Sequence, residues 1–182
     1  MLINRKWYII AGAPGAGKTT TIKRLVSLGY AVTPEAPRLI INKAIKKGKT
    51  MREIRGDEAE FQKKVFRMKV RIENKILPGQ LTFLDDGGLP ACIAYYQISG
   101  LDPTPIIKEV KKRKYRAIFF LEPLPYKNDY ARIEDKKTAK VLHKLLYKTY
   151  QNLGYKVIRV PVKPVEERIK FILNRLDDKK IQ

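Results

Sequence analysis

A glycine-rich segment near the start of the chain has the residue types and spacing that bind nucleotide phosphates. Residues 12–19 read Gly-Ala-Pro-Gly-Ala-Gly-Lys-Thr and fit the pattern G-x-x-x-x-G-K-[ST]. An apolar run, Trp7 to Ala11, precedes them and an amphipathic helical pattern follows, so strand, loop and helix come in the required order. Glycines let successive backbone N–H groups point inward at phosphates, and the helix N-terminus adds its positive end.

The residues of this loop are expected to bind a nucleoside triphosphate with Mg²⁺, and two of them have specific roles. The Lys18 ammonium is expected to reach the β- and γ-phosphates, and the Thr19 hydroxyl to bind the magnesium ion. The predicted nucleotide-binding residues are Gly12, Ala13, Pro14, Gly15, Ala16, Gly17, Lys18, Thr19 and Thr20.

Two adjacent carboxylates follow an apolar run further along the chain. Asp85 and Asp86 come directly after residues 81–84, Leu-Thr-Phe-Leu, and so stand at the end of a predicted strand. An acid in that place holds hydrated magnesium from the side opposite Thr19, because a hard divalent cation prefers oxygen ligands. We therefore expect Asp85 and Asp86 to bind the metal and Asp86 to be catalytic. A turn is the alternative, since paired Asp residues also favour turns.

A carboxylate and a guanidinium follow a strand predicted earlier in the chain, at about residues 30–33. Glu35 and Arg38 lie just beyond its end. In open α/β sheets ligands collect at the carboxyl ends of the strands, so both residues are candidates for a ligand site. The alternative is a solvent-exposed pair at the start of a helix.

The rest of the chain alternates helical and strand patterns. Helices are predicted at about residues 20–28, 39–47, 57–77, 89–98, 104–112, 136–153 and 164–176, and strands at 7–11, 30–33, 81–84, 115–121 and 155–160. Residues 49–56 are predicted to be a polar connection, and residues 122–137 a flap over the site with Asp129 and Arg132 at its tip. The alternation predicts one α/β domain over residues 1–182, with a five-stranded, mostly parallel sheet and helices on both faces.

Composition limits the classes of function. The 182 residues carry a net charge of +21, which must attract polyanions. Residues 1–91 hold 18 basic and 8 acidic residues, and residues 92–182 hold 21 and 10, so no basic tail exists and any nucleic-acid binding is expected to be non-specific. Single Cys and His residues exclude an internal disulfide and argue against a Cys/His zinc site.

No apolar run is long enough for a transmembrane segment and no signal peptide is evident, so a cytoplasmic location is expected, while the oligomeric state stays open.

Taken together, the motifs resemble the P-loop ATPase/kinase-like domains grouped with the ribosylnicotinamide kinase domain. The resemblance covers nearly the whole chain and rests on residues 12–20, 34–38, 61–62, 84–90, 94–96, 129, 132, 150–155, 161 and 166–168. It implies a nucleoside/nucleotide-kinase-like P-loop fold that binds ATP, or alternatively GTP, with Mg²⁺ and a small hydroxyl-bearing acceptor.

If the chain is a kinase, four further residues have expected roles. Glu35 would accept the proton of the acceptor hydroxyl, while Arg38 and Gln62 would hold the acceptor. Arg132 would close on the γ-phosphate. Two departures from the family pattern stand out: the family has Asp-Arg-Gly followed by Pro-Asp, and here Gly87 falls on its Arg and Ala91 on its second Asp. A guanidinium that would steady the transferred phosphate is missing, which weighs against full kinase activity.

Two functions fit these observations. The first is a kinase that transfers the γ-phosphate of ATP to a small, nucleoside-like acceptor, because phosphoryl transfer needs positioning and charge neutralisation more than covalent chemistry. The second is a nucleotide-regulated ATPase or GTPase switch that binds an anionic macromolecule or lipid, for which the charge of +21 and the missing arginine speak. A guanine-specific Asn-Lys-x-Asp motif is absent from the sequence, so ATP is favoured.

Overall fold

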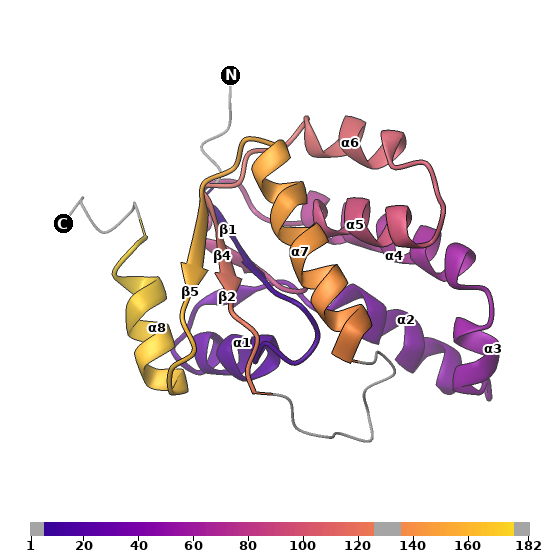
Figure 1. Cartoon of the computed structure of the whole chain (residues 1–182), viewed down its shortest axis with the longest axis horizontal. Coiled ribbons are helices and arrows are strands. Elements are labelled where there is room, and N and C mark those ends of the chain that lie inside the picture. The colour runs from indigo at the N-terminus through magenta and orange to yellow at the C-terminus, as the bar shows by residue number, and fades with distance from the viewer. Residues whose placement is uncertain (1–5, 126–135, 177–182) are drawn as a thin grey trace.

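Five parallel strands form the centre of the computed structural model, which describes residues 6–125 and 136–176 (Figure 1). The strands are β1 (Trp7–Ala11), β2 (Ala31–Val32), β3 (Thr82–Leu84), β4 (Ala117–Leu121) and β5 (Val157–Val160). Their order in the sheet is β2-β3-β1-β4-β5, and Ile9 of β1 lies between Leu84 and Ile118 of its two neighbours. Every residue of β1 and β4 is buried, as expected of apolar strands covered on both faces.

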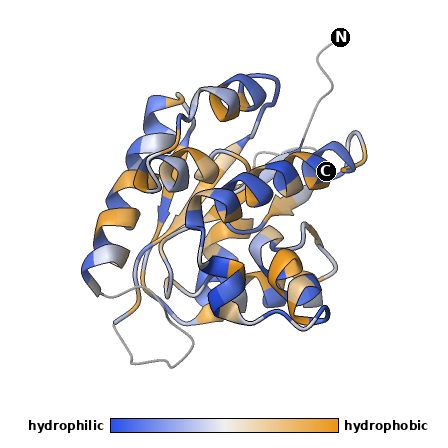
Figure 2. Cartoon of the chain, turned by 90° about the vertical axis from the view of Figure 1, so that its right-hand side faces the viewer, coloured by the Kyte–Doolittle hydropathy of each residue, from blue (hydrophilic) through white to orange (hydrophobic). Residues whose placement is uncertain are grey.

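Helices cover both faces of this sheet (Figure 1). They are α1 (Lys18–Ser27), α2 (Ala36–Ile45), α3 (Met51–Arg55), α4 (Glu58–Asn74), α5 (Ala91–Ile98), α6 (Thr104–Val110), α7 (Lys136–Asn152) and α8 (Val165–Leu173). Alternation along β1 divides the core: Tyr8 and Ile10 pack with buried residues of α1 and α8, whereas Trp7 and Ile9 pack with those of α4, α5, α6 and α7. In Figure 2 the helices show hydrophobic and hydrophilic stripes, as amphipathic surface helices do. The predicted α/β class with helices on both faces is confirmed, and the described sheet is parallel throughout.

One element differs from the prediction. The segment predicted as a polar connection, residues 49–56, contains the helix α3. The Thr50 hydroxyl accepts a hydrogen bond from the Glu53 N–H at 3.3 Å, and the Glu53 carboxylate accepts one from the Thr50 N–H at 2.7 Å. This reciprocal capping box satisfies N–H groups at the start of a helix too short to show an apolar period.

Asp129 and Arg132, placed at the tip of the predicted flap, lie outside the described residues. Within the described ranges, none of the helices combines the length and the hydropathy that crossing a membrane requires.

Candidate functional site

The glycine-rich loop lies between β1 and α1, and its backbone requires glycine at two positions that contact other elements. Gly12 has φ 147° and Gly17 has φ 83°. A Cβ on Gly12 would stand 2.9 Å from the carbonyl oxygen of Leu121, and one on Gly17 would stand 2.5 Å from Nη1 of Arg168. Side chains at these positions would displace the end of β4 or the guanidinium beneath the loop. The loop is therefore a cradle that only glycine allows.

Lys18 curls back over this cradle. Its Nζ donates to the carbonyl oxygens of Gly12 at 2.9 Å and Ala13 at 3.2 Å. Within the described ranges no carboxylate lies within ion-pair distance of this ammonium. Its charge is therefore held beside the loop without an acidic partner, which is the condition for binding a phosphate.

Arg168 of α8 supports the loop from below. Its Nη1 donates to the carbonyl oxygen of Ala16 at 3.2 Å and its Nε to that of Lys163 at 2.7 Å. The residue is 7% exposed, and burial lowers the pKa of its guanidinium. Sequence reasoning gave Arg168 no role, because only the fold shows that α8 lies under the loop.

Asp85 stands at the carboxyl end of β3, the strand beside β1. Its N–H donates to the Thr33 hydroxyl at 3.0 Å, and its Oδ1 accepts from the N–H of Asp86 at 2.6 Å. Burial, followed by the charge of Asp86, raises the pKa of Asp85 to about 6. The charge of Glu35 also raises this pKa, and that of Lys18 lowers it, so groups that follow β2 and β1 both act on the carboxylate that follows β3.

Asp86 has a different partner. Its φ is 51°, in the left-handed region where Asp is among the tolerated residues, and its Oδ2 lies 3.2 Å from Nζ of Lys69. Lys69 of α4 is 5% exposed and also donates to the carbonyl oxygens of Asp86 at 2.6 Å and Gly88 at 3.0 Å. The half-buried carboxylate of Asp86 is thus paired with a buried cation of α4. Nothing in the sequence pattern distinguished Lys69 from the exposed lysines of the same helix.

Gly87, where the family pattern leads one to expect arginine, has no room for a side chain. Its φ is 74°, and a Cβ would lie 2.5 Å from the Tyr150 hydroxyl and 2.7 Å from the Ala91 Cβ. The hydroxyl of the fully buried Tyr150 donates to the Gly87 carbonyl oxygen at 2.9 Å. The departure at Gly87 is therefore built into the packing of α5 and α7 against this turn.

The predicted acceptor residues are only partly brought together. Arg38 Nε lies 3.1 Å from the Glu35 carboxylate at the start of α2, so the two form the helix-start pair that was the alternative interpretation. The side chain of Arg38 is 64% exposed. Gln62 is buried and donates through Nε2 to Glu58 at 2.7 Å. The Glu58 carboxylate also accepts hydrogen bonds from Nε and Nη2 of Arg55, so Gln62 belongs to a cluster at the start of α4.

A hollow of about 950 Å³ opens beside the loop, between the end of β4, α7 and the end of β5. Its volume lies in the range that accommodates small organic ligands. It is lined by Ala13, Pro14, Gly15, Glu122, Pro123, Leu124, Pro125, Ala139, Lys140, His143, Lys144, Tyr147, Lys148, Gln151, Arg159 and Val162.

The described residues hold no group of three or more His, Cys, Asp or Glu side chains able to bind a metal ion by themselves. Thr19, the second residue of α1, and Asp85, directly after β3, nevertheless carry the kind of oxygen ligand that Mg²⁺ takes when phosphate oxygens supply the rest of its coordination.

Comparison with known proteins identifies the family. The family described as AAA domain matches residues 7–168. The chain belongs to this family. No curated protein sequence matches the chain.

Solved structures share the fold of this AAA-domain chain at low sequence identity. The NadR protein in complex with NAD and AMP-PNP has a TM-score of 0.69 and 14% identity over 92% of the chain, which spans 48% of that protein. Deoxyadenosine kinase from M. mycoides with bound dCTP has a TM-score of 0.60 and 15% sequence identity, and the match covers 94% of this chain and 99% of that kinase. Thymidylate kinase from Ehrlichia chaffeensis has a TM-score of 0.63 and 15% sequence identity, and the match covers 94% of this chain and 98% of that kinase. The chain thus has the fold of P-loop nucleoside and nucleotide kinases.

Proposed function

We propose that this AAA-domain chain is an ATP-binding kinase that transfers the γ-phosphate to a hydroxyl of a small, nucleoside-like acceptor, with GTP as the alternative donor. The observation that carries the proposal is the convergence of Lys18, Asp85 and Glu35, which follow the adjacent strands β1, β3 and β2, with the charges of Lys18 and Glu35 both acting on Asp85. A cation for phosphates, an acid for a metal and a second acid for an acceptor hydroxyl are the groups that phosphoryl transfer requires.

Each residue has a role in this proposal. The loop residues 12–20 bind the triphosphate, with Lys18 on its β- and γ-oxygens, and the hollow beside residues 13–15 takes the rest of the nucleotide. Thr19 and Asp85 hold Mg²⁺, which neutralises charge on the phosphates. Glu35 takes the proton of the acceptor hydroxyl and Arg38 binds the acceptor.

Three of the predicted site residues take modified roles. Asp86 is committed to Lys69, so we assign the metal to Asp85 and give Asp86 the task of fixing the turn after β3. Gln62 acts from within its cluster with Glu58, at the rim of the acceptor site. Arg132 remains the candidate for the γ-phosphate, from a segment outside the described residues.

The structural neighbours support a nucleoside-like acceptor. One is a deoxyadenosine kinase and another a thymidylate kinase, and a NadR structure holds NR. Because identities are 13–15%, these likenesses establish the fold and only suggest the class of acceptor.

Glu35→Gln tests the proposal. Transfer of labelled phosphate from ATP would be measured against a panel of ribo- and deoxyribonucleosides, with ATP hydrolysis without acceptor as the control reaction. The variant should lose about 10²–10⁴-fold in transfer yet retain hydrolysis, because a general base contributes to its own step alone. A parallel loss of both activities would place Glu35 in the nucleotide site or the fold and contradict the assignment.

The second candidate is a nucleotide-regulated switch, and the packing at Gly87 favours it. A turn with no space for a phosphate-steadying arginine suits nucleotide binding without efficient transfer. ATP hydrolysis with no transfer to any acceptor of the panel would support the switch.

A further inference from the structure

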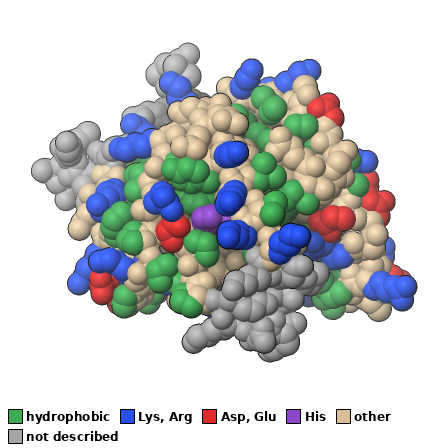
Figure 3. All heavy atoms as spheres, in the orientation of Figure 1, with side chains coloured by type: hydrophobic (Ala, Val, Ile, Leu, Met, Phe, Trp, Pro, Cys, Tyr) green, Lys and Arg blue, Asp and Glu red, His purple; other side chains and the backbone are tan. Residues whose placement is uncertain are grey.

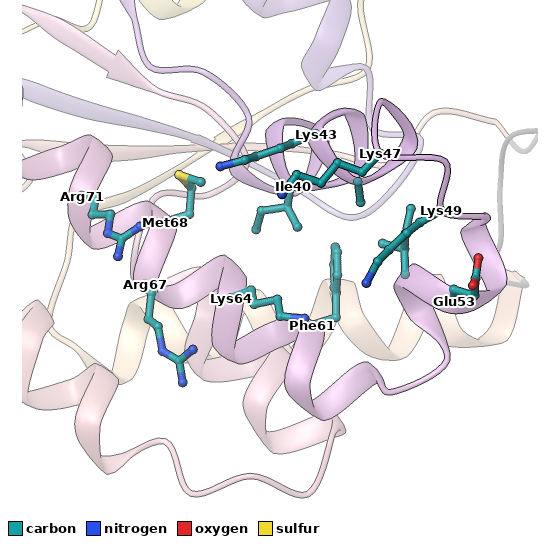
Figure 4. Close-up of a pocket in the computed structure, with 12 residues that line it drawn as sticks. Ile40, Lys43, Lys47, Lys49, Glu53, Phe61, Lys64, Arg67, Met68 and Arg71 are labelled. Carbon is teal, nitrogen blue, oxygen red and sulfur yellow. The ribbon is translucent and has the colours of Figure 1, made fainter.

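A second concave site lies away from the phosphate loop, between α2, α3 and α4 (Figure 4). Its volume is about 400 Å³, within the range of small-molecule pockets. It shares no lining residue with the hollow beside the phosphate loop. It is lined by Ile40, Lys43, Ala44, Lys47, Lys49, Glu53, Ile54, Phe61, Lys64, Arg67, Met68 and Arg71.

The rim of this α2–α4 groove is strongly basic. Six Lys or Arg residues border it with one carboxylate, Glu53, which is engaged by Thr50 in the capping box of α3. Of the six, only Arg67 makes an ion pair with a described residue, and the other five include two pairs on facing walls: Lys43 of α2 with Lys47 just after its end, and Lys64 with Arg71 on α4. The two pairs come from opposite sides of the groove (Figure 4). Arg67 points away from α2 and lies 3.8 Å from Glu60, so it contributes less.

The floor of the groove is apolar. Ile40, Ala44, Ile54, Phe61 and Met68 form it, and Phe61 is 2% exposed. The groove therefore combines a surface that buries a ring or a short hydrocarbon with cations on two sides that bind anionic groups.

The clustering of these cations has an energetic consequence. Lys43 lies on α2 and Lys47 in the turn that follows it, and Lys64 and Arg71 lie on one side of α4, so like charges from both walls surround one groove and repel each other. A bound anion replaces this repulsion with attraction. It should therefore stabilise the native state in proportion to its occupancy.

We propose that the α2–α4 groove is a binding site for a small organic polyanion, with an apolar body on the floor and two or more phosphate or sulfonate groups between the cations of α2 and α4. The volume and the two facing helical walls fit a compact ligand and leave no room for a nucleic-acid duplex. This site is separate from the one in which Lys18, Asp85 and Glu35 converge, so it stands whether or not the chain transfers phosphate.

A fluorescent pyrene trisulfonate is a suitable probe, because it has a flat apolar body and three negative charges. Its binding would be followed by fluorescence polarisation at low salt, with inorganic triphosphate as competitor. The double variant Lys64→Glu/Arg71→Glu should weaken binding by about tenfold or more, since it replaces attraction by repulsion on one wall. Lys111→Glu/Lys114→Glu changes the total charge equally at exposed positions outside the groove, and it should bind as the unmodified protein does. Lys18→Ala should also leave probe binding unchanged.

Circular dichroism and thermal melting would establish that each variant is folded, and Lys64→Gln/Arg71→Gln provides a milder change with a smaller expected loss. Equal losses in the groove pair and in the control pair would overturn the proposal, as the probe would then sense only the total charge. Loss with Lys18→Ala alone would place the probe in the phosphate loop and overturn it too. If a short single-stranded RNA lost affinity specifically in the groove pair while the trisulfonate and triphosphate failed to bind, the site would be a nucleic-acid site instead.

Discussion

Asp85 and Asp86 are adjacent in the sequence, but their carboxylates have different surroundings. Asp85 lies among Glu35, Lys18 and Asp86, and its pKa is raised to about 6 mainly because it is buried. Asp86 is paired with Lys69, which is itself buried. Asp85 therefore carries a charge that costs stability until a cation arrives, whereas Asp86 contributes to the fold.

The first prediction concerns the stability cost of Asp85. Between its ordinary pKa of 3.8 and about 6, the native state holds a proton that the unfolded state releases, so stability falls as pH rises through this window. Asp85→Asn removes the charge and keeps an oxygen to accept the Asp86 N–H. At pH 8 with chelator, the variant should be more stable by about 1–3 kcal/mol in urea unfolding, and the gain should vanish near pH 4.

The same variant should lose magnesium-dependent nucleotide binding, measured by calorimetry with and without Mg²⁺. A gain in stability with no loss in magnesium dependence would remove Asp85 from the metal site. A stability difference independent of pH would contradict its raised pKa.

The second prediction concerns the buried pair of Lys69 and Asp86. Lys69→Met should cost about 3–5 kcal/mol of unfolding free energy, because the half-buried carboxylate of Asp86 would lose its cation and the carbonyl oxygens of Asp86 and Gly88 would lose their donor. Lys69→Met/Asp86→Asn should recover part of that loss, since no uncompensated charge remains. Urea unfolding of the single and double variants forms a double-mutant cycle. Additive costs would mean that the ion pair is not coupled in solution.

At the scale of elements, α8 reaches the phosphate loop through one side chain. Arg168→Met preserves much of the volume but removes the donors to Ala16 and Lys163, leaving a buried carbonyl oxygen of the loop unsatisfied. The third prediction is a loss of about 1–3 kcal/mol in stability and of about tenfold in ATP affinity, because the loop is no longer held in its binding geometry.

Arg175→Met is the matched control for Arg168→Met. Arg175 also donates to a backbone carbonyl, that of Phe171, but at an exposed position away from the loop. Arg175→Met should change neither the unfolding free energy nor the ATP affinity beyond experimental error. Equal effects of the two substitutions on ATP affinity would show that Arg168 does not position the loop.

The sequence predicts the helices and strands that carry a regular pattern of apolar residues. Elements that are held by polar contacts are harder to predict from it. The strand before Gly12 and the helix over residues 57–77 follow from apolar runs and stripes, and the structure has β1 and α4 there. The short helix α3 lacks an apolar stripe, and the sequence signal for its start is the capping-box spacing of Thr50 and Glu53.

Buried charge was the part of the site that the sequence could not reveal. Lys69 and Glu73 of α4 are 5% and 3% exposed, although the helix carries many solvated charges. Glu73 accepts hydrogen bonds from the Tyr115 hydroxyl and the Leu89 N–H, and these partners are remote in sequence. Which charged residue of an amphipathic helix faces inward depends on such tertiary partners, and one sequence does not contain that information.

At the scale of the whole molecule, basic residues are spread over many elements. Figure 3 shows Lys and Arg side chains grouped around the histidine on one face, and the α2–α4 groove holds a further set. The net charge of +21 over 182 residues produces a positive field around the molecule as a whole. Such a field attracts any polyanion without selecting a sequence.

The last prediction follows from this distribution. Single-stranded RNA should bind at low salt, and the logarithm of its affinity should fall linearly and steeply with the logarithm of salt concentration, because binding depends on counterion release. Homopolymer and mixed sequences should give the same slope within about one unit. Lys64→Glu/Arg71→Glu and Lys111→Glu/Lys114→Glu should weaken RNA binding equally, since each removes the same charge from the surface field. Fluorescence polarisation over a salt series measures the slope, its dependence on RNA sequence and the effect of each variant. Tight binding of one RNA sequence that persists at moderate salt would contradict the prediction, because contacts to bases would then have to supply affinity that the dispersed charges cannot.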